Sequence, residues 1–262
     1  MEILNFRTRR PAIALGLLVA GGMVFAGEAT NGTFAARAET EWRRAQTQFQ
    51  LHTNDAAAAW QLARACFEFN DFATNNAGRA ELASQGIAAS RQSLARESNS
   101  APGHYYLAIE LGLLADTKRN PLAFKLVREM ERELKTADDL DPHFDYAGPA
   151  RCLGLLYRDA PGWPFSIGSN RKAREYLDQA AAIAPDYPEN QLNLVETFLD
   201  WYDVAAAKHA LAALDTLWPT AEKQFTGEAW ERSWNDWSKR RAAARRKLDE
   251  MSAPAKHSRG SD

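Results

Sequence analysis

The sequence predicts an all-α protein built as a solenoid of paired helices. Three observations predict this class. Ala, Leu, Glu, Arg and Gln, which favour helices, dominate the 262 residues. Apolar residues recur at helical spacing, as at Leu107, Leu111 and Leu114, while Val, Ile and Thr are sparse and do not alternate. Prolines recur at one position of a repeating pattern, which indicates stacked structural units.

The first 26 residues have the layout of a secretory signal peptide. Three Arg residues between positions 7 and 10 precede an uncharged apolar run, and Ala26 is the expected last residue removed. The alternative is an uncut membrane anchor, but the run is shorter than the about 20 residues that a span needs. No Cys follows the run, so we do not expect a lipoprotein. The localisation predicted is periplasmic, as a soluble protein after cleavage.

The charge balance argues against a nucleic-acid partner. Removal of residues 1–26 takes away three Arg and one Glu, and this changes the formal net charge from −2 to −4. A mildly acidic chain lacks the basic footprint of a nucleic-acid-binding protein.

One pattern of small residues, Leu and Pro occurs twice, 34 residues apart. The first copy comprises Ala173, Leu177, Ala180 and Pro185, and the second comprises Ala207, Leu211, Leu214 and Pro219. Such spacing is typical of the second helix of a tetratricopeptide repeat, a unit of about 34 residues with two helices. The sequence therefore predicts a tetratricopeptide-like solenoid of helical hairpins.

The closing Pro extends this register toward the N-terminus. Pro102, Pro142, Pro185 and Pro219 are separated by 40, 43 and 34 residues. The earlier units thus carry insertions between their two helices. We predict an irregular repeat domain over residues 55–217 with helix pairs at 55–98, 101–140, 144–184 and 188–217.

Two helices are expected to flank the repeat domain. Residues 27–54 form an N-terminal segment with a short helix over 37–51, and residues 218–252 hold a C-terminal helix over 227–251. Apolar residues fall on one side of the second helix, namely Trp230, Trp234, Trp237, Ala244, Leu248 and Met251. This helix either caps the solenoid or binds a partner through its Trp residues. Its solvated side is predicted to carry Lys239, Arg240, Arg245, Arg246 and Lys247. Residues 253–262 are expected to be disordered.

The two cysteines are expected to be buried free thiols. Cys66 and Cys152 fall on first helices two repeats apart. Helices pack at about 8–10 Å, so the two Cα atoms should lie beyond the roughly 7 Å that a disulfide allows.

One insertion resembles a known family. The segment from Gly162 through Trp163, Pro164 and Phe165 to Gly168 lies between two repeat helices. With the continuation over 172–190, it is similar to the periplasmic T-component proteins of tripartite ATP-independent periplasmic (TRAP) transporters. The similarity covers about residues 55–217.

The resemblance implies an accessory protein of solute uptake. It implies a trimer whose subunits hold a ligand-accessible pore and pass a hydrophobic small molecule to a periplasmic solute-binding protein. The chain departs from the family in lacking the Cys of a lipoprotein.

Aromatic residues are the candidate ligand- or partner-binding side chains. Trp163 and Phe165 lie on the Gly/Pro-rich insertion with Gly162 and Pro164. Burying each ring is worth roughly 1.5–3 kcal/mol. The rings therefore either pack back onto the solenoid or line a groove. A second set, His104, Tyr105 and Tyr106, begins a first helix; these side chains either face the concave surface or pack ordinarily.

No catalytic motif, cofactor motif or metal motif is apparent. The five His form no His-Glu-x-x-His pair, and the chain has neither a phosphate-binding Gly-rich loop nor a nucleophile elbow. The acidic cluster of Asp138, Asp139, Asp141 and Asp145 lacks EF-hand spacing and is interpreted as a solvated turn.

A binding module is therefore the leading hypothesis and an enzyme the least favoured. The module would hold a small apolar ligand or dock a solute-binding protein. The alternative is an envelope adaptor that joins proteins without a small ligand. A pocket lined by Trp163 and Phe165 would favour the ligand, and a broad polar groove would favour the adaptor.

Overall fold

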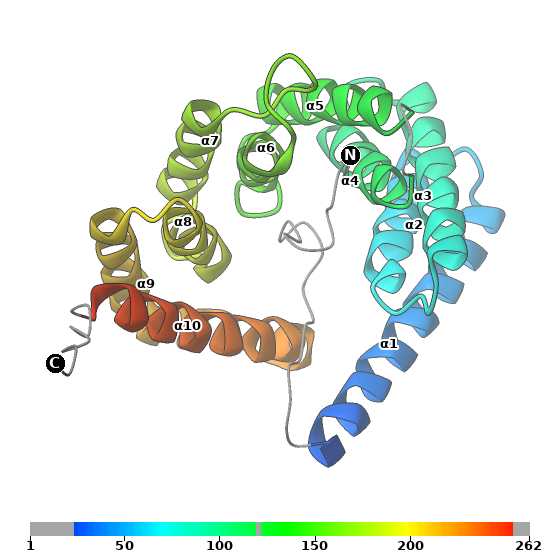
Figure 1. The fold of residues 1–262 in the computed structure, drawn as a ribbon. Coiled ribbons are helices and arrows are strands. Elements are labelled where there is room, and N and C mark those ends of the chain that lie inside the picture. The colour runs from blue at the N-terminus through cyan, green and yellow to red at the C-terminus, as the bar shows by residue number, and fades with distance from the viewer. Residues whose placement is uncertain (1–23, 119–121, 254–262) are drawn as a thin grey trace, which may run out of the picture. The chain divides into compact units, whose positions relative to one another are not determined.

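The computed structural model describes residues 24–118 and 122–253, and the regular structure in these ranges is helical (Figure 1). It comprises ten α-helices, one 3-10 helix and an isolated bridge between Gly162 and Gly168. The all-α prediction is confirmed, with neighbouring helices packed in a repeat-like arrangement. Most of the predicted signal peptide and nearly all of the predicted disordered tail lie outside the described residues.

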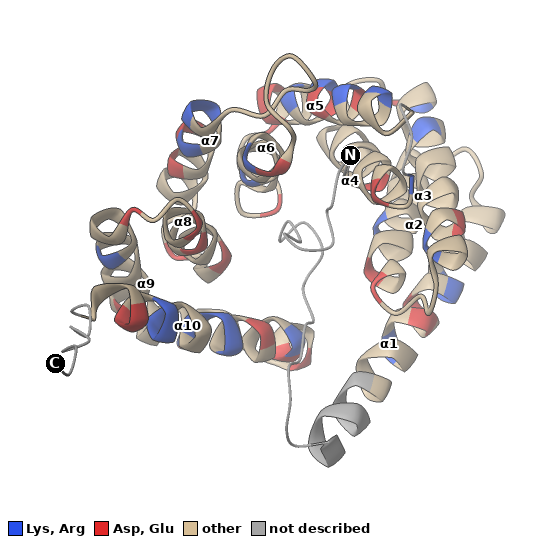
Figure 2. Ribbon diagram, viewed as in Figure 1, with Lys and Arg blue, Asp and Glu red and all other residues tan. Residues whose placement is uncertain are grey.

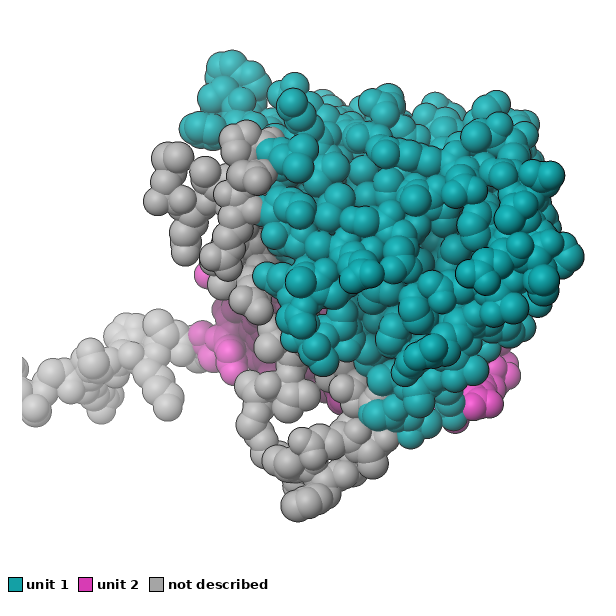
Figure 3. Space-filling view, turned by 90° about the vertical axis from the view of Figure 1, so that its right-hand side faces the viewer, with its two compact units in different colours: residues 1–184 teal, residues 185–262 magenta. Residues whose placement is uncertain are grey.

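The chain divides into two compact units, which Figure 3 colours separately. The first runs to Ala184 and the second begins at Pro185. The helices of unit 1 are α1 (Val24–Leu51), α2 (Ala56–Asn70), α3 (Asn76–Arg96), α4 (Ala101–Asp116), α5 (Leu122–Leu140), α6 (Gly148–Asp159) and α7 (Asn170–Ile183). The helices of unit 2 are α8 (Pro188–Asp200), α9 (Val204–Gln224), a 3-10 helix (Glu228–Trp230) and α10 (Glu231–Ser252). Within the described ranges, no helix is long and apolar enough to cross a bilayer.

Helix α1 is longer than the sequence pattern suggests. It begins at Val24 rather than near residue 37 and continues to Leu51. No Pro interrupts this stretch, so nothing in it forces the helix to end. Its Trp42 ring lies 5.4 Å from the ring of Phe69, which packs α1 against α2.

Short polar side chains define where several helices begin. Asp55, Asn75, Ser100 and Ser169 each precede a helix, and each side-chain oxygen accepts a backbone N–H from the first turn. These caps satisfy N–H groups that have no partner inside the helix. The helix starts are thus fixed by local chemistry.

Small residues let consecutive helices of unit 1 approach closely. A Cβ added at Gly112 would lie 2.9 Å from the sulfur of Met130, and one at Gly154 would lie 2.6 Å from Cγ of Leu177. A side chain at Gly154 would also lie 3.1 Å from the backbone N of Leu177 and would push α6 and α7 apart, whereas one at Gly112 would require the end of Met130 to move. Leu177 is buried as the repeat pattern predicts.

Three of the four marker prolines lie where one helix pair gives way to the next. Pro102 is in the first turn of α4, and Pro142 and Pro185 follow α5 and α7. Pro219, however, lies inside α9, which continues to Gln224. The expected end of this helix near residue 217 is therefore wrong. An interior Pro costs about 3 kcal/mol, but burial of Trp218 and Ala221 offsets that cost.

A left-handed turn joins α5 to α6. Asp145, Tyr146 and Ala147 have φ values of 50°, 55° and 63°. The guanidinium of Arg151 donates to the carbonyl oxygens of Asp145 and Tyr146 at 3.1 and 3.0 Å and to Oδ2 of Asp145 at 2.7 Å. Tyr105 also donates its hydroxyl to Oδ2 of Asp145 at 2.6 Å. These bonds hold a conformation that L-residues otherwise avoid.

The acidic cluster is only in part the solvated turn that its composition suggests, since Asp139 is exposed but two other members are held by partners. Asp145 is bound by Arg151, and Asp138 accepts a hydrogen bond from Gln179 at 3.1 Å. The carboxylates of Asp138 and Asp145 thus bind different partners and do not act as one acidic group. By contrast, the expectation for Cys66 and Cys152 is confirmed, since both are free and buried. Burial raises the pKa of the Cys66 thiol.

Helix α10 packs on α8 and α9 within unit 2. Trp237, Ala244 and Leu248 are buried, which agrees with the predicted apolar side. Arg240, however, does not lie on the solvated side: its side chain is only 15% exposed. It binds three carboxylates, those of Glu189, Glu196 and Asp236. The sequence spacing within α10 could not indicate that Arg240 has carboxylate partners on α8.

Candidate functional site

The insertion at residues 160–169 forms a closed loop between α6 and α7. Gly168 donates its N–H to the carbonyl of Pro161 at 2.9 Å, next to the bridge between Gly162 and Gly168. Ser169 donates its N–H to the carbonyl of Tyr157 at 2.8 Å. Both ends of the loop are therefore fixed to the helices that it joins.

Gly168 is required by the close approach at the base of this loop. A Cβ added there would lie 2.0 Å from the carbonyl oxygen of Ala160. Gly162 has more room, since its added Cβ would meet nothing nearer than 3.8 Å. The conformation of the loop therefore requires glycine at position 168 but not at position 162.

Trp163 and Phe165 project from the loop into solvent. Trp163 is 89% exposed and Phe165 is 74% exposed. The expectation that these rings pack back onto the helices is therefore wrong. Backbone hydrogen bonds close the base of the loop, and the aromatic rings take no part in them. Pro164, which lies between them and follows a cis peptide bond, completes the tip of the loop.

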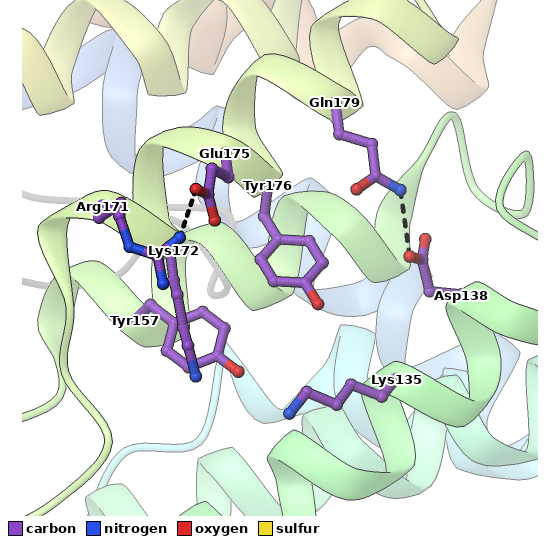
Figure 4. A pocket seen from close by; sticks show the side chains of 8 residues that line it. All are labelled: Lys135, Asp138, Tyr157, Arg171, Lys172, Glu175, Tyr176 and Gln179. Carbon is purple, nitrogen blue, oxygen red and sulfur yellow. Dashed lines mark hydrogen bonds and ion pairs between the residues drawn. The ribbon is translucent and has the colours of Figure 1, made fainter.

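A polar pocket of about 310 Å³ lies between α5, the end of α6 and the start of α7 (Figure 4). Five of its eight lining side chains carry a charge. The lining residues are Lys135, Asp138, Tyr157, Arg171, Lys172, Glu175, Tyr176 and Gln179. Tyr157 and Arg171 stand at the two ends of loop 160–169, so the loop and the pocket adjoin.

Glu131 is the internal counter-ion at one side of this pocket. Its Oε1 accepts hydrogen bonds from Nζ of Lys135 at 2.7 Å and from the hydroxyl of Tyr157 at 2.5 Å. Desolvation opposes ionisation of Glu131, but these two bonds prevail and lower the pKa of its carboxyl. Burial and the bond to Glu131 raise the pKa of Tyr157 to about 12, so its hydroxyl stays protonated at neutral pH.

Lys172 closes no direct ion pair among the described residues, but its charge helps to lower the pKa of the Glu131 carboxyl. Its Nζ lies 4.8 Å from the centre of the Tyr157 ring, a cation–π contact. Tyr157 in turn stacks on Tyr176 with ring centres 5.7 Å apart. Figure 4 shows Lys172 crossing Tyr157 at one side of the pocket, with Tyr176 in the middle.

The other charged residues of the pocket have contacts of two kinds, an ion pair and a hydrogen bond from a neutral amide. Arg171 binds Glu175 at 2.6 Å, and Gln179 donates to Asp138. Burial raises the pKa of the Asp138 carboxyl. Lys and Arg are interspersed with Asp and Glu along α5 and α7 (Figure 2). The pocket is therefore a mixed-charge site in which three cations face the carboxylates of Glu131, Glu175 and Asp138.

The structure does not bring His104, Tyr105 and Tyr106 into this site. Nδ1 and Nε2 of His104 lie 2.6 Å from Oε2 of Glu133 and 3.0 Å from the carbonyl oxygen of Ser98. Tyr105 and Tyr106 are buried among aromatic rings of unit 1. Tyr105 and Tyr106 therefore pack in the core, as the second of the two alternatives predicted.

The sequence reasoning missed the pocket residues. A signal existed in Arg171 and Lys172, two consecutive cations in the first turn of α7. Cations are disfavoured there because the helix macrodipole is positive at its N-terminus. The lining residues Lys135 and Asp138 on α5 could not be placed beside them from the sequence, because they lie more than 30 positions earlier in the chain.

The described side chains offer no metal centre. In residues 24–118 and 122–253, no group of three or more His, Cys, Asp or Glu side chains is placed to hold a metal ion. The arrangement at the pocket is suited to binding, since it combines charges of both signs with flat aromatic walls.

Comparison with known families gave a match over part of the chain. Residues 33–147 match the family described as Regulator of microtubule dynamics protein 1-3. No curated protein matched the chain. The matched segment runs from within α1 to the turn before α6, so it ends before loop 160–169.

This match overturns the resemblance to TRAP transporter T-components, because it indicates a different family. The helical continuation over 172–190, which contributed to the resemblance, has a simpler physical explanation. Small residues and Leu at helical spacing are what any stacked helix pairs require. The Gly-Trp-Pro-Phe insert lies outside the matched residues.

Proposed function

We propose that this chain is a protein-binding scaffold of tetratricopeptide-type helix pairs that docks its partner through loop 160–169. The observation that carries the proposal is the exposure of Trp163 and Phe165 on a loop fixed at its base. Large aromatic side chains provide much of the binding energy at protein interfaces. A preformed loop loses little conformational entropy on binding, which favours affinity.

A protein partner accounts for these side chains better than a small apolar ligand does. Sites for apolar ligands are concave and mostly apolar. Here the aromatic rings face solvent and the adjoining pocket has a largely charged lining. A second protein would cover Trp163 and Phe165 from outside. The adaptor hypothesis is therefore favoured over the ligand-carrying one.

Site-specific photo-crosslinking tests the docking role. A benzophenone amino acid replaces Trp163, and in a second variant Phe165, in the cells that make the protein. The matched control carries the same group at Tyr202, an aromatic residue that is 80% exposed on unit 2. We expect discrete protein adducts from the loop positions and none from position 202. Equal labelling at all three positions would remove the docking role.

We also propose that the protein is exported and cleaved after Ala26. The basic and apolar segments of residues 1–26 support this. Cleavage would remove the first three residues of α1, which begins at Val24. The intact mass of protein from its native cells tests the proposal. A mass that corresponds to a start at Gly27 is expected, and a mass that includes residues 1–26 would contradict it.

The family match favours a second candidate function, an effect on microtubule dynamics through residues 33–147. Turbidity of polymerising tubulin with and without the protein tests this candidate. A change in polymerisation rate that persists in Trp163→Ala would support it over the docking loop. The two candidates also differ in compartment, since tubulin is not met by an exported protein.

A further inference from the structure

We infer that the junction between α10 and α8 is a proton-operated latch, which holds α10 most tightly when Asp236 carries a proton. As Asp236 ionises, the hold loosens, and the faces that α8 and α9 turn toward α10 become accessible. The latch lies wholly in unit 2 and does not involve loop 160–169. It is built around the side chain of Arg240.

All five N–H groups of the Arg240 guanidinium are occupied. Nε and Nη2 donate to the two oxygens of Glu196 at 2.8 and 2.9 Å. Nη1 donates to Oε1 of Glu189 at 2.7 Å and to Oδ2 of Asp236 at 3.1 Å. The second N–H of Nη2 donates to Oδ1 of Asn193 at 2.8 Å. A guanidinium has five such donors, so this one has none left to offer.

The three carboxylates do not share these donors equally. Glu196 accepts two bonds from Arg240. Glu189 accepts one from Arg240 and one from the indole N–H of Trp237 at 2.8 Å. Asp236 accepts only the longest bond of the set, and no second donor reaches its carboxyl among the residues that the structure describes. Hydrogen bonds to an ionised carboxylate favour its ionisation, so Asp236 is the member that takes up a proton most easily.

The junction also holds more negative than positive charge. When all three carboxylates are ionised, one guanidinium faces three of them. The side chains of Glu189 and Asp236 are only 5% and 13% exposed, so water screens their repulsion poorly. Burial raises the pKa of Asp236; Arg240 lowers it in part and Glu189 raises it again, to about 6. A proton on Asp236 removes one of the surplus charges.

The charges that α9 turns toward α10 do not titrate with Asp236. Asp215 of α9 binds Arg241 and Arg245, each at 2.7 Å. Burial opposes ionisation of Asp215, but the two guanidinium groups prevail and lower the pKa of its carboxyl. Asp215 is therefore already ionised where Asp236 takes up its proton. Further charges along α10 are the ion pair of Lys247 with Asp200 and the exposed Glu228 and Glu231.

The direction of the pH effect follows from the two states of α10. When α10 is detached, the Asp236 carboxyl meets water and has an ordinary pKa of about 3.9. The packed state binds the proton more tightly than the detached state, so protonation favours packing. The extra hold is complete below a pH of about 4 and is lost as the pH rises to about 6. Above that pH, the buried side chains of Trp237, Ala244 and Leu248 still retain the helix.

Hydrogen–deuterium exchange of the full chain between pH 4 and pH 7 tests the latch. Rates are corrected for the intrinsic effect of pH on amide exchange. The protection of amides in α10 should fall by up to about tenfold per pH unit between pH 4 and pH 6, because opening releases one proton. In Asp236→Asn, which keeps the shape of the protonated side chain, it should stay at the acid level throughout. A flat profile for α10 in the native protein would overturn the latch.

Two further variants control for surface charge and for a fault in the amide variant. Asp249→Asn removes an exposed carboxylate of the same helix and should keep the native slope. Asp236→Ala lacks the carboxyl and should show no slope, whatever its overall protection. Circular dichroism checks the helix content of each variant. A slope that persists in both Asp236 variants would overturn the assignment of the proton to Asp236. Loss of the slope in Asp249→Asn would overturn a latch at this junction in favour of surface charge.

Discussion

The indole N–H of Trp237 donates to Oε2 of Glu189 at 2.8 Å and so joins α10 to α8. The other oxygen of the same carboxylate accepts from Arg240 at 2.7 Å. Asp236 lies 3.1 Å from Arg240. Burial, opposed in part by Arg240, raises the pKa of Asp236 to about 6. The orientation of α10 on α8 is thus set by a buried network as well as by aromatic packing.

Removal of the cation from this network should destabilise unit 2 strongly. Arg240→Met would leave the carboxylates of Glu189, Glu196 and Asp236 facing one another without a counter-ion. Removing one partner of a buried ion pair lowers the free energy of unfolding by about 3–5 kcal/mol. Urea unfolding followed by Trp fluorescence measures the loss. The exposed neighbour Lys239, changed to Met, should unfold at the native midpoint.

Glu110 should make the stability of unit 1 depend on pH. Its side chain is buried on α4, neither oxygen has a hydrogen-bond partner in the described chain, and Gly86 leaves the space that it occupies. Desolvation raises the pKa of this carboxyl well above its ordinary value. The folded state therefore holds the proton, whereas the unfolded state releases it above a pH of about 4.3. Stability should fall as pH rises from there toward the folded pKa, by about 1.4 kcal/mol per pH unit.

The variant Glu110→Gln tests this pH dependence. An amide does not ionise, so the free energy of unfolding should lose its decline between pH 5 and 7. Glu97→Gln, at an exposed position, should keep the native pH profile. A profile in Glu110→Gln that overlays that of the native protein would show that Glu110 is ionised in the folded state.

Tyr202 should be a site where Gly stabilises the protein. It follows α8 with φ of 60°, and the N–H groups of Tyr202 and Asp203 donate to the carbonyls of Leu199 and Phe198. This is the hydrogen-bond pattern of a Schellman motif, whose left-handed position favours Gly. Since the ring is 80% exposed, Tyr202→Gly should raise the free energy of unfolding by about 1 kcal/mol. A melting temperature below that of the native protein would show that the Tyr202 ring makes a stabilising contact.

The two glycines of loop 160–169 should respond differently to Ala. Gly168→Ala forces a Cβ against the carbonyl of Ala160, so the loop must change its path. Gly162→Ala meets no such contact. We expect Gly168→Ala to lower partner or peptide affinity at least as much as Trp163→Ala, and Gly162→Ala to bind normally. Binding assays measure the affinity of each variant, and circular dichroism checks that its helix content is unchanged. Equal affinity of the two glycine variants would show that binding does not depend on the path of the loop.

Local spacing in the sequence was sufficient to predict the helices and their buried faces. Ala173, Leu177 and Ala180 are buried in α7 as their pattern requires, and the copy 34 residues later is buried in α9. The helical period relates residues three and four positions apart, so the sequence alone shows which residues share one face of a helix. Pro219 predicted a helix end because it was interpreted from its neighbours in the sequence alone. The helix α9 continues through it because packing against other helices buries the residues around it.

Only the tertiary structure decided which charges are paired and which aromatic rings are exposed. Arg240 meets the carboxylates of Glu189 and Glu196 on α8, more than 40 positions away. Glu131 on α5 accepts hydrogen bonds from Lys135 on its own helix and from Tyr157 on α6. Trp163 stays in solvent because hydrogen bonds at the loop base hold it there. Helix formation follows from neighbours along the chain, whereas ion pairing and exposure depend on which helices pack together. The sequence by itself thus determined the scaffold, and packing decided its binding surface.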